Sequence, residues 1–265
     1  MDIKEIDRMA VKWIKEAGER IRSSINHKLD ISTKKDANDL VTNVDRETEQ
    51  FFVNNIRSCF PGHKILGEEG FGEDLQTVDG YIWVIDPIDG TMNFVHQRRN
   101  FMISVGIYKD GTGLAGYIYD VIRDELFSAI KGEGAFLNGE PLKSLVPTTL
   151  EKSIIGINAS WVTENRHIDF QRLVPLVKKA RGTRSLGSAA MEMAYVAAGW
   201  LDAYISLRLS PWDYAAGKII VEELGGRATT LDGEPLSLLT GSTVFFSKPG
   251  LYEYIMENYL KGLKE

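Results

Sequence analysis

Apolar residues recur every three or four positions over the first part of the chain, in a series that begins at Ile3 and ends at Ile21. This spacing is typical of an amphipathic helix that buries one face. A second helix is predicted to start near Asp45, because aspartate favours the N-cap position, and to run toward Pro61.

After residue 80 the pattern changes to short apolar runs bounded by turn-forming residues. Strands are predicted at 81–85, 102–108, 114–119, 126–130, 154–158 and 203–207, and Asn138-Gly139 predicts a tight turn. Helices are predicted at 166–179, 188–198 and 211–224, the last opened by Pro211 and closed by Gly225-Gly226. Strands and helices alternate in blocks, which indicates a mixed α/β fold built in layers. No repeat or linker divides the sequence, so one domain over residues 1–265 is expected.

The composition is that of a globular protein, with 43% hydrophobic and 26% charged residues. The 31 basic and 37 acidic residues give a net charge of −6 without a basic stripe, so we expect no nucleic-acid partner. The chain has no signal-peptide core and no apolar run near the ~20 residues of a membrane span, so we expect a soluble protein without a membrane partner. Cys59 is the only cysteine, which excludes an intrachain disulfide and fits a reducing cytoplasm.

Two carboxylates directly follow the predicted strand 81–85, in the sequence Asp86-Pro87-Ile88-Asp89. In an extended chain they would lie roughly 10 Å apart, but Pro87 favours a turn that returns Asp89 to the side of Asp86. Both carboxylates and the Ile88 carbonyl could then bind one Mg²⁺, which prefers oxygen ligands. The structural alternative is that Asp86 caps the strand and Asp89 forms a turn.

Other acidic segments allow the same two interpretations. Glu68 and Glu69 lie between two glycines, either in a solvated loop or as metal ligands. Asp213 lies in the first turn of a predicted helix, where a carboxylate is favoured without any catalytic role. Gly90-Thr91 is a predicted helix start, whose free N–H groups can hold a phosphate.

Four motifs together resemble the inositol monophosphatase family. They are Asp39-Leu-Val-Thr-Asn-Val-Asp45, Gly67-Glu-Glu-Gly70, Trp83-Val-Ile-Asp-Pro-Ile-Asp-Gly-Thr-Met-Asn-Phe94 and Pro211-Trp-Asp-Tyr-Ala-Ala-Gly217. Their order and separation agree with the family over essentially the whole chain. More narrowly, the chain resembles the Firmicute type, some members of which also remove the 2′-phosphate of NADP.

The resemblance implies an α-β-α-β-α sandwich of the fructose-1,6-bisphosphatase type, with a metal-binding half at about 1–140 and a second half at about 141–265 that completes the site. It also implies a homodimer, two or three Mg²⁺ ions and inhibition by Li⁺. The implied metal ligands are Glu68, Asp86, the Ile88 carbonyl, Asp89 and Asp213. The implied catalytic group is Glu68 with Thr91, which positions the attacking water, and its supporting residue Asp45. Lys34 and Asp39 are expected beside the ligands or at a third metal.

The implied substrate-binding residues come from both halves of the chain. They are Asp89, Gly90, Thr91, Gly187, Ser188, Ala189, Ser206, Arg208 and Asp213. Animal members of the family carry a glutamate that holds inositol hydroxyls seven residues before the metal aspartate, where this chain has Ser206. Arg208 nearby either suits a substrate with an additional phosphate or pairs with a surface acid.

The predicted activity is Mg²⁺-dependent release of phosphate from inositol 1-phosphate by direct attack of a metal-activated water, in a cytoplasmic enzyme. The alternatives are NADP 2′-phosphatase or fructose-1,6-bisphosphatase activity, or a non-catalytic regulator of RNA transcription with the same fold. A haloacid-dehalogenase type is excluded, because its second aspartate follows two residues after the first, where this chain has Ile88.

Overall fold

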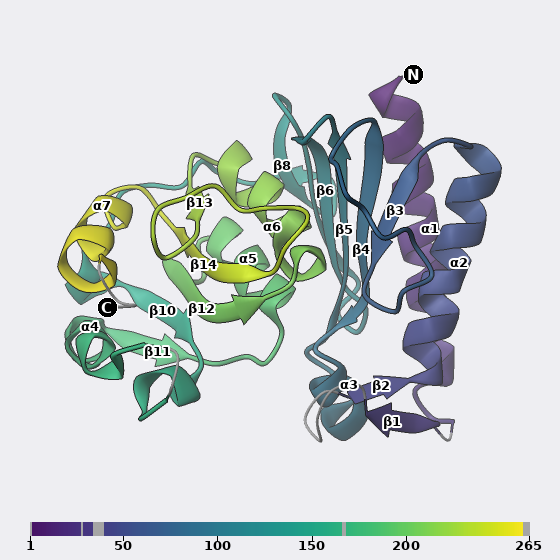
Figure 1. The fold of residues 1–265 in the computed structure, drawn as a ribbon. Helices are drawn as coiled ribbons and strands as arrows, with labels where there is room; N and C mark the ends of the chain where they lie inside the picture. The colour runs from purple at the N-terminus through teal and green to yellow at the C-terminus, as the bar shows by residue number, and fades with distance from the viewer. Residues whose placement is uncertain (1, 28, 34–39, 166–167, 262–265) are drawn as a thin grey trace.

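The computed structural model describes residues 2–27, 29–33, 40–165 and 168–261 and arranges them in five layers (Figure 1). Two helices cover the outer face of a seven-stranded sheet, two more separate this sheet from a five-stranded one, and two short helices cover the far face. In that order the pairs are α1 (Ile3–Ser24) and α2 (Asn43–Cys59), α5 (Ala189–Ala197) and α6 (Pro211–Glu223), and α4 (Leu173–Lys179) and α7 (Tyr252–Ile255). The predicted α-β-α-β-α sandwich is therefore confirmed.

The larger sheet is antiparallel except for its first pair of strands. Its order is β3 (Lys64–Gly67), β4 (Tyr81–Asp89), β5 (Met102–Lys109), β6 (Thr112–Asp120), β7 (Glu125–Ile130), β8 (Gly134–Leu137) and β9 (Glu140–Pro141). The smaller sheet has the order β11 (Gly182–Arg184), β10 (Ile154–Ile157), β12 (Ala203–Leu209), β14 (Ser242–Ser247) and β13 (Arg227–Thr229). The remaining elements are the hairpin β1 (Ile31–Thr33) and β2 (Leu40–Thr42), helix α3 (Thr91–Gln97), and short turns of helix η1 (Leu150–Lys152), η2 (Ala159–Val162), η3 (Phe170–Arg172) and η4 (Met256–Leu260).

The predicted helices and strands are present, with corrections at three boundaries. Helix α2 has its N-cap at Thr42, so Asp45 lies in the first turn and closes a capping box instead of being the cap itself. Strand β4 continues to Asp89, although the sequence predicts its end at residue 85. The helix predicted at 166–179 appears as η3 followed by α4, and residues 166–167 lie outside the described chain.

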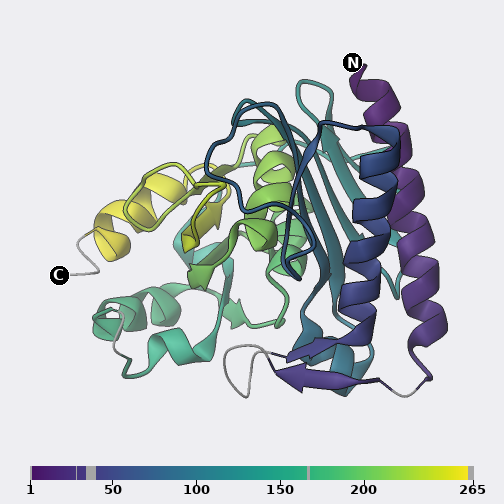
Figure 2. The same cartoon turned by 45° about the vertical axis from the view of Figure 1, so that its right-hand side comes forward.

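Strand β4 is buried on both faces, which explains its continuous apolar run. Ile82 and Val84 pack toward α5 and α6, whereas Trp83 and Ile85 pack toward α1 and α2. The turned view shows α1 and α2 side by side across the outer face of the sheet (Figure 2).

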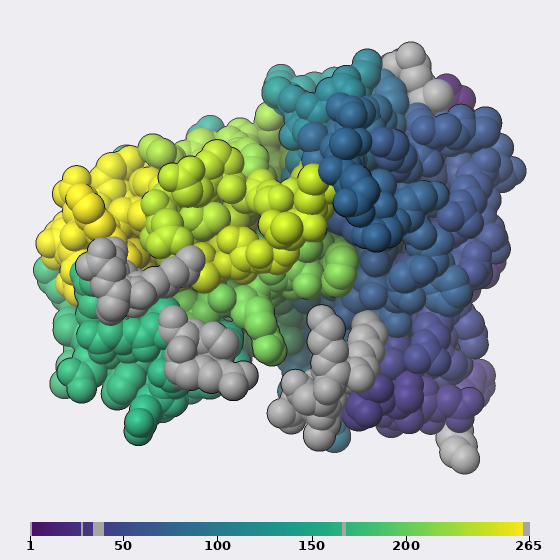
Figure 3. All heavy atoms as spheres, viewed as in Figure 1, coloured from purple at the N-terminus to yellow at the C-terminus, as the bar shows by residue number. Residues whose placement is uncertain are grey.

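Helix α6 approaches the large sheet closely. Gly106 and Gly116 are paired on β5 and β6, and a Cβ atom at Gly116 would lie 2.6 Å from the Ala216 carbonyl oxygen. Small residues on both elements therefore allow the contact, which brings the first turn of α6 to the end of β4. In the space-filling view the green and yellow C-terminal part meets the blue N-terminal part across this face (Figure 3).

Within the described residues, no helix combines the length and the apolar composition that a bilayer span requires.

Candidate active site

An extra residue in β4 places two carboxyl groups together. Asp86 is paired with Ser104 on β5 and Asp89 with Met102, so three steps on β4 face two steps on β5. Side chains three residues apart point to opposite faces of a regular strand, but a bulge of one residue removes this difference. The predicted return of Asp89 to the side of Asp86 is therefore confirmed, but it comes from a bulge inside β4 and not from a turn after the strand. The Ile88 N–H donates to Asp86 Oδ1 over 3.0 Å within this bend.

Asp213 joins this pair from the other half of the chain. Carboxylate oxygens of Asp86, Asp89 and Asp213 all lie within 4.8 Å of one another. Asp213 also closes the capping box of α6, because its Oδ2 accepts from the Ser210 N–H over 2.7 Å. One carboxylate oxygen of Asp213 therefore caps the helix. Capping does not conflict with metal binding, because Asp213 also lies within the group of three aspartates.

Glu68 reaches the same place from the loop after β3. Its N–H donates to the Ile85 carbonyl over 3.3 Å, and its side chain hydrogen-bonds the Asp86 carboxyl. The carboxyl oxygens within 4.8 Å of one another are those of the three aspartates, and Glu68 adjoins them at Asp86. We refer to Glu68, Asp86, Asp89 and Asp213 as the acid cluster.

The loop that carries Glu68 is fixed by Glu49, which the sequence analysis does not identify. The Glu49 carboxylate on α2 is fully buried and accepts from the N–H groups of Glu69 over 2.6 Å and Phe71 over 2.8 Å. A signal was present, since Glu49 follows Asp45 by four residues and therefore lies on the same helix face.

Thr91, the first residue of α3, lies beside the acid cluster. Its hydroxyl is 3.1 Å from both Asp45 Oδ1 and the Ile88 carbonyl oxygen. Asp45 is itself held by Thr42, whose N–H and hydroxyl donate to its second oxygen. The Thr91 hydroxyl thus contacts Asp45, the residue that the family resemblance gives as its support. Lys34 and Asp39 lie outside the described residues.

Burial and mutual repulsion make this region electrostatically unfavourable for carboxylates. Burial, and after it the charges of Glu68, Asp89 and Asp213, raise the pKa of Asp86 well above its usual value. Burial also raises the pKa of Asp89 and of Asp45 to about 6 each. A divalent cation would supply the missing positive charge, and a donor set made only of oxygens fits Mg²⁺.

A cavity of about 250 Å³ adjoins the acid cluster, and we refer to it as the side pocket. Its lining comes from four segments: Asp89; Asn158 and Trp161; Ser185, Gly187, Ser188, Ala189 and Glu192; and Tyr204, Ile205, Ser206, Leu209 and Asp213. Asp89 on β4 is hydrogen-bonded to the start of α5, because its Oδ2 accepts from the Ser188 hydroxyl and from the Ala190 N–H. Gly90, with φ of +95°, lies against this junction, because a Cβ there would be 3.1 Å from the Ser188 Cβ.

Of the two β12 residues expected to contact substrate, only Ser206 lines the side pocket. Ser206 is 5% exposed, whereas Arg208 is exposed to solvent and is not among the lining residues. The pairing of β12 with β14 shifts between Ser206 and Leu209, so the regular alternation of side chains does not extend to Arg208. The expected pocket contact of Arg208 is therefore not made in this structure.

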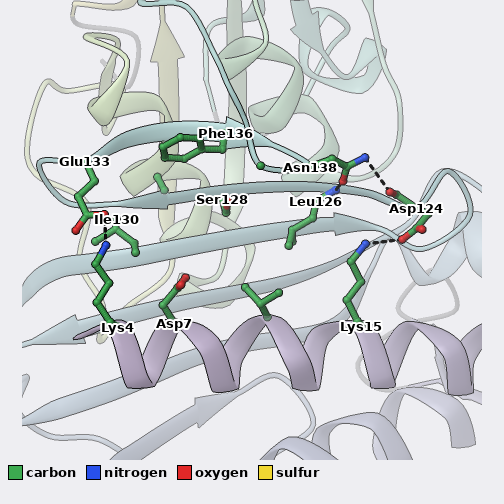
Figure 4. Close-up of a pocket in the computed structure, with 13 residues that line it drawn as sticks. Lys4, Asp7, Lys15, Asp124, Leu126, Ser128, Ile130, Glu133, Phe136 and Asn138 are labelled. Carbon is green, nitrogen blue, oxygen red and sulfur yellow. Dashed lines mark hydrogen bonds and ion pairs between the residues drawn. The ribbon is translucent and has the colours of Figure 1, made fainter. Parts of the chain in front are cut away.

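A larger cavity, of about 560 Å³, lies between α1 and the strands β7 and β8 (Figure 4). Lys4 and Lys15 extend from α1 to Glu133 and Asp124 at its two ends. These acids are already paired with lysines and lie apart, so this cavity lacks the convergent carboxyl groups of the acid cluster. We therefore place the functional site at the acid cluster and the side pocket.

Comparison with known proteins gives a consistent result. A sequence model of the inositol monophosphatase family matches residues 2–261. The chain is 55% identical over 260 residues to the inositol-1-monophosphatase of Bacillus subtilis strain 168, which covers 98% of both chains. The crystal structure of inositol monophosphatase-II from Staphylococcus aureus MSSA476 is similar with a TM-score of 0.89 and 44% identity, over 97% of this chain and 95% of that one. A structure of an inositol monophosphatase/NADP phosphatase complexed with NADP and Ca²⁺ has a TM-score of 0.91 at 30% identity, over 100% of this chain and 99% of that one.

Proposed function

The chain belongs to the inositol monophosphatase family, and we propose that it releases phosphate from inositol 1-phosphate in an Mg²⁺-dependent reaction. The observation that carries the proposal is the acid cluster, in which carboxyl oxygens from β4 and α6 lie within 4.8 Å of one another beside the side pocket. Helix capping alone would not bring these groups together.

The residues proposed to hold the metal are Glu68, Asp86, the Ile88 carbonyl, Asp89 and Asp213, with two or three Mg²⁺ ions. Bound Mg²⁺ supplies Lewis-acid chemistry, which polarises a phosphate and lowers the pKa of water. The raised pKa values of Asp86 and Asp89 support this assignment, because they indicate a site that lacks positive charge of its own.

The chain's own groups orient the reactants. The Thr91 hydroxyl donates to Asp45, so its oxygen can accept a hydrogen bond from the attacking water and orient it. Asp89 and Asp213 belong both to the acid cluster and to the lining of the side pocket, so they face the phosphate and the alcohol side at once. The segment Gly187-Ser188-Ala189 lines the space for the alcohol. No side chain needs to form a covalent bond to phosphorus.

A 2′-phosphatase activity on NADP is the second candidate. It is supported by the similarity to the inositol monophosphatase/NADP phosphatase that was crystallised with NADP and Ca²⁺. The exposed position of Arg208 weighs against a second phosphate contact from that residue.

Phosphate release from a panel of esters tests the proposal. The substrates are inositol 1-phosphate, NADP, fructose 1,6-bisphosphate and 3′-phosphoadenosine 5′-phosphate, each with Mg²⁺, with EDTA, and with Mg²⁺ plus Li⁺. We expect the highest kcat/KM for inositol 1-phosphate, loss of activity with EDTA, and inhibition by Li⁺. A higher kcat/KM for NADP would favour the second candidate, and absence of metal-dependent release from every ester would reject both.

Two further parts of the proposal rest on less: the homodimer is what the family resemblance implies, and the cytoplasmic location is inferred from the single cysteine. Sedimentation velocity of the purified protein tests the first and fractionation of the source cells tests the second.

A further inference from the structure

Glu192 is a buried carboxyl in the wall of the side pocket that the proposed reaction does not yet use. It lies on α5 and is 4% exposed. Its Oε1 accepts from the Leu186 N–H over 2.8 Å, whereas Oε2 has no hydrogen-bond partner among the described residues. One oxygen is therefore fixed by the backbone, and the other is unpaired.

The Glu192 carboxyl fits beside β10 only because residue 156 is a glycine. Gly156 on β10 lies directly against it, since a Cβ at that position would be 2.0 Å from Oε2. Tyr204 on β12 lies on the same side, since its ring would be 3.1 Å from that Cβ. Glu192, Tyr204 and Ser206 thus form one polar wall of the side pocket.

An unpaired buried carboxyl oxygen is costly, because it has lost its water and gained no donor. The cost is visible in the pKa of Glu192, which burial raises to about 7. A donor brought by a ligand would relieve this cost. The terminal torsion of a glutamate is soft, so a rotation of the carboxyl group can bring an oxygen toward the pocket, and the same rotation weakens the hydrogen bond from the Leu186 N–H.

Glu192 also differs from the other carboxyl groups of the side pocket. Those groups are Asp89 and Asp213, which belong to the acid cluster, whereas Glu192 comes from α5 and lies outside that cluster.

We infer that Glu192 is a specificity-determining residue, whose unpaired oxygen accepts a hydrogen bond from a hydroxyl of the leaving alcohol. The inference rests on the proposed function and deepens it. The ligands that it favours are phosphate esters of polyols, and it gives no advantage to an ester whose alcohol has no further hydroxyl.

The test compares two esters that differ only in those hydroxyls. Inositol 1-phosphate and cyclohexyl phosphate share a six-membered ring, but the second has no ring hydroxyl. Glu192→Gln keeps the size of the side chain and an oxygen for the Leu186 N–H, but its second terminal atom becomes a donor. We expect kcat/KM for inositol 1-phosphate to fall about tenfold or more, as for loss of a hydrogen bond to a charged group, and kcat/KM for cyclohexyl phosphate to change less than about threefold.

The ratio of the two kcat/KM values separates this role from a structural one. An equal loss on both esters would mean that Glu192 only shapes the loop at Leu186, and no loss on either ester would mean that it does not contact the alcohol; both results leave the ratio unchanged and overturn the inference. If Glu192→Gln does not fold, Gly156→Ala decides in the same way, because it displaces the carboxyl without removing it. Glu222→Gln is the matched control, since Glu222 is an exposed partner of Lys218.

Wild-type protein distinguishes this inference from the proposed function. If it does not hydrolyse inositol 1-phosphate with Mg²⁺, the proposed function fails. If it does, and the ratio is unchanged in the variant, only the role of Glu192 fails.

Discussion

The acid cluster and the side pocket share Asp89 and Asp213, yet they are built in different ways. Two members of the acid cluster are three residues apart on β4, and the strand bulge that unites them is local. The lining of the side pocket is spread from Asp89 to Asp213 over both halves of the chain. A short segment of one strand thus provides two of the proposed metal ligands. The residues proposed to select the substrate come from elements that are distant in the sequence, so they depend on how those elements pack.

Removal of one acid-cluster carboxylate should give the largest effect. Asp86→Asn keeps the size of a side chain that is 1% exposed and removes its charge. Metal stabilisation of transition-state charge is worth several kcal/mol, so we expect kcat for inositol 1-phosphate to fall by about 10³-fold or more. Ser206→Ala, in the side pocket, is the contrast and should lose less than about tenfold. Comparable losses in the two variants would remove the distinction between the regions.

A smaller loss is expected when the acid cluster is disturbed indirectly. Glu49→Gln removes one acceptor from the pair of hydrogen bonds that fixes the Glu68 loop. Groups that orient metal ligands typically contribute about 10–100-fold to metal affinity or activity, so the Mg²⁺ concentration for half-maximal rate should rise within that range. The KM for inositol 1-phosphate at saturating Mg²⁺ should stay near the wild-type value. A changed KM with unchanged Mg²⁺ dependence would contradict the role of Glu49 in holding the Glu68 loop beside the acid cluster.

The pH dependence of stability provides a further contrast. Burial raises the pKa values of Asp45 and Asp89 from 3.8 to about 6, so the folded state holds more protons than the unfolded state within this window. Stability without metal should consequently fall as pH rises through the window, and Mg²⁺, which binds the ionised groups, should restore it. Thermal melting should show a larger increase in Tm with Mg²⁺ at about pH 8 than at about pH 5.5. Glu192→Gln in the side pocket should keep this Mg²⁺ effect, and Asp86→Asn should reduce it.

The smallest effect is expected at Arg208. Because its side chain is exposed outside the side pocket, Arg208→Ala should change kcat/KM by less than about twofold on both inositol 1-phosphate and NADP. A loss specific to NADP would show that Arg208 contacts a phosphate group of NADP other than the 2′-phosphate. The substrate site would then extend beyond the residues that line the side pocket.

These two regions also differ in how much the sequence predicts. The position of Asp86 and Asp89 after a buried strand is visible in the motif, and the helix starts at Thr91 and Pro211 follow from ordinary signals. The bulge in β4 was not predictable, since it depends on the pairing of Asp86 and Asp89 with β5. Pro87 indicated a bend there, but proline is compatible both with a turn and with a bulge.

In the side pocket the sequence signals are weaker. Glu192 is an acid within a helix of alanine and methionine, which hints at a buried charge, but its neighbour Gly156 lies 36 positions earlier in the chain. Counting back from Asp213 identified Ser206, which does line the side pocket, but it left open whether the nearby Arg208 faces the pocket or the surface. The register shift in β12 between Ser206 and Leu209 decides this, and the sequence does not show it. Contacts between distant elements are set by packing, and a single sequence does not specify them.

The most direct test of the central claim is the position of bound metal. Crystals soaked with Mn²⁺, as a substitute for Mg²⁺ with a strong anomalous signal, should show peaks at direct ligand distance, about 2–2.6 Å, from oxygens of Glu68, Asp86, Asp89 and Asp213. At least one peak should contact groups from both β4 and α6. Anomalous peaks only elsewhere, or more than about 6 Å from these oxygens, would contradict the account.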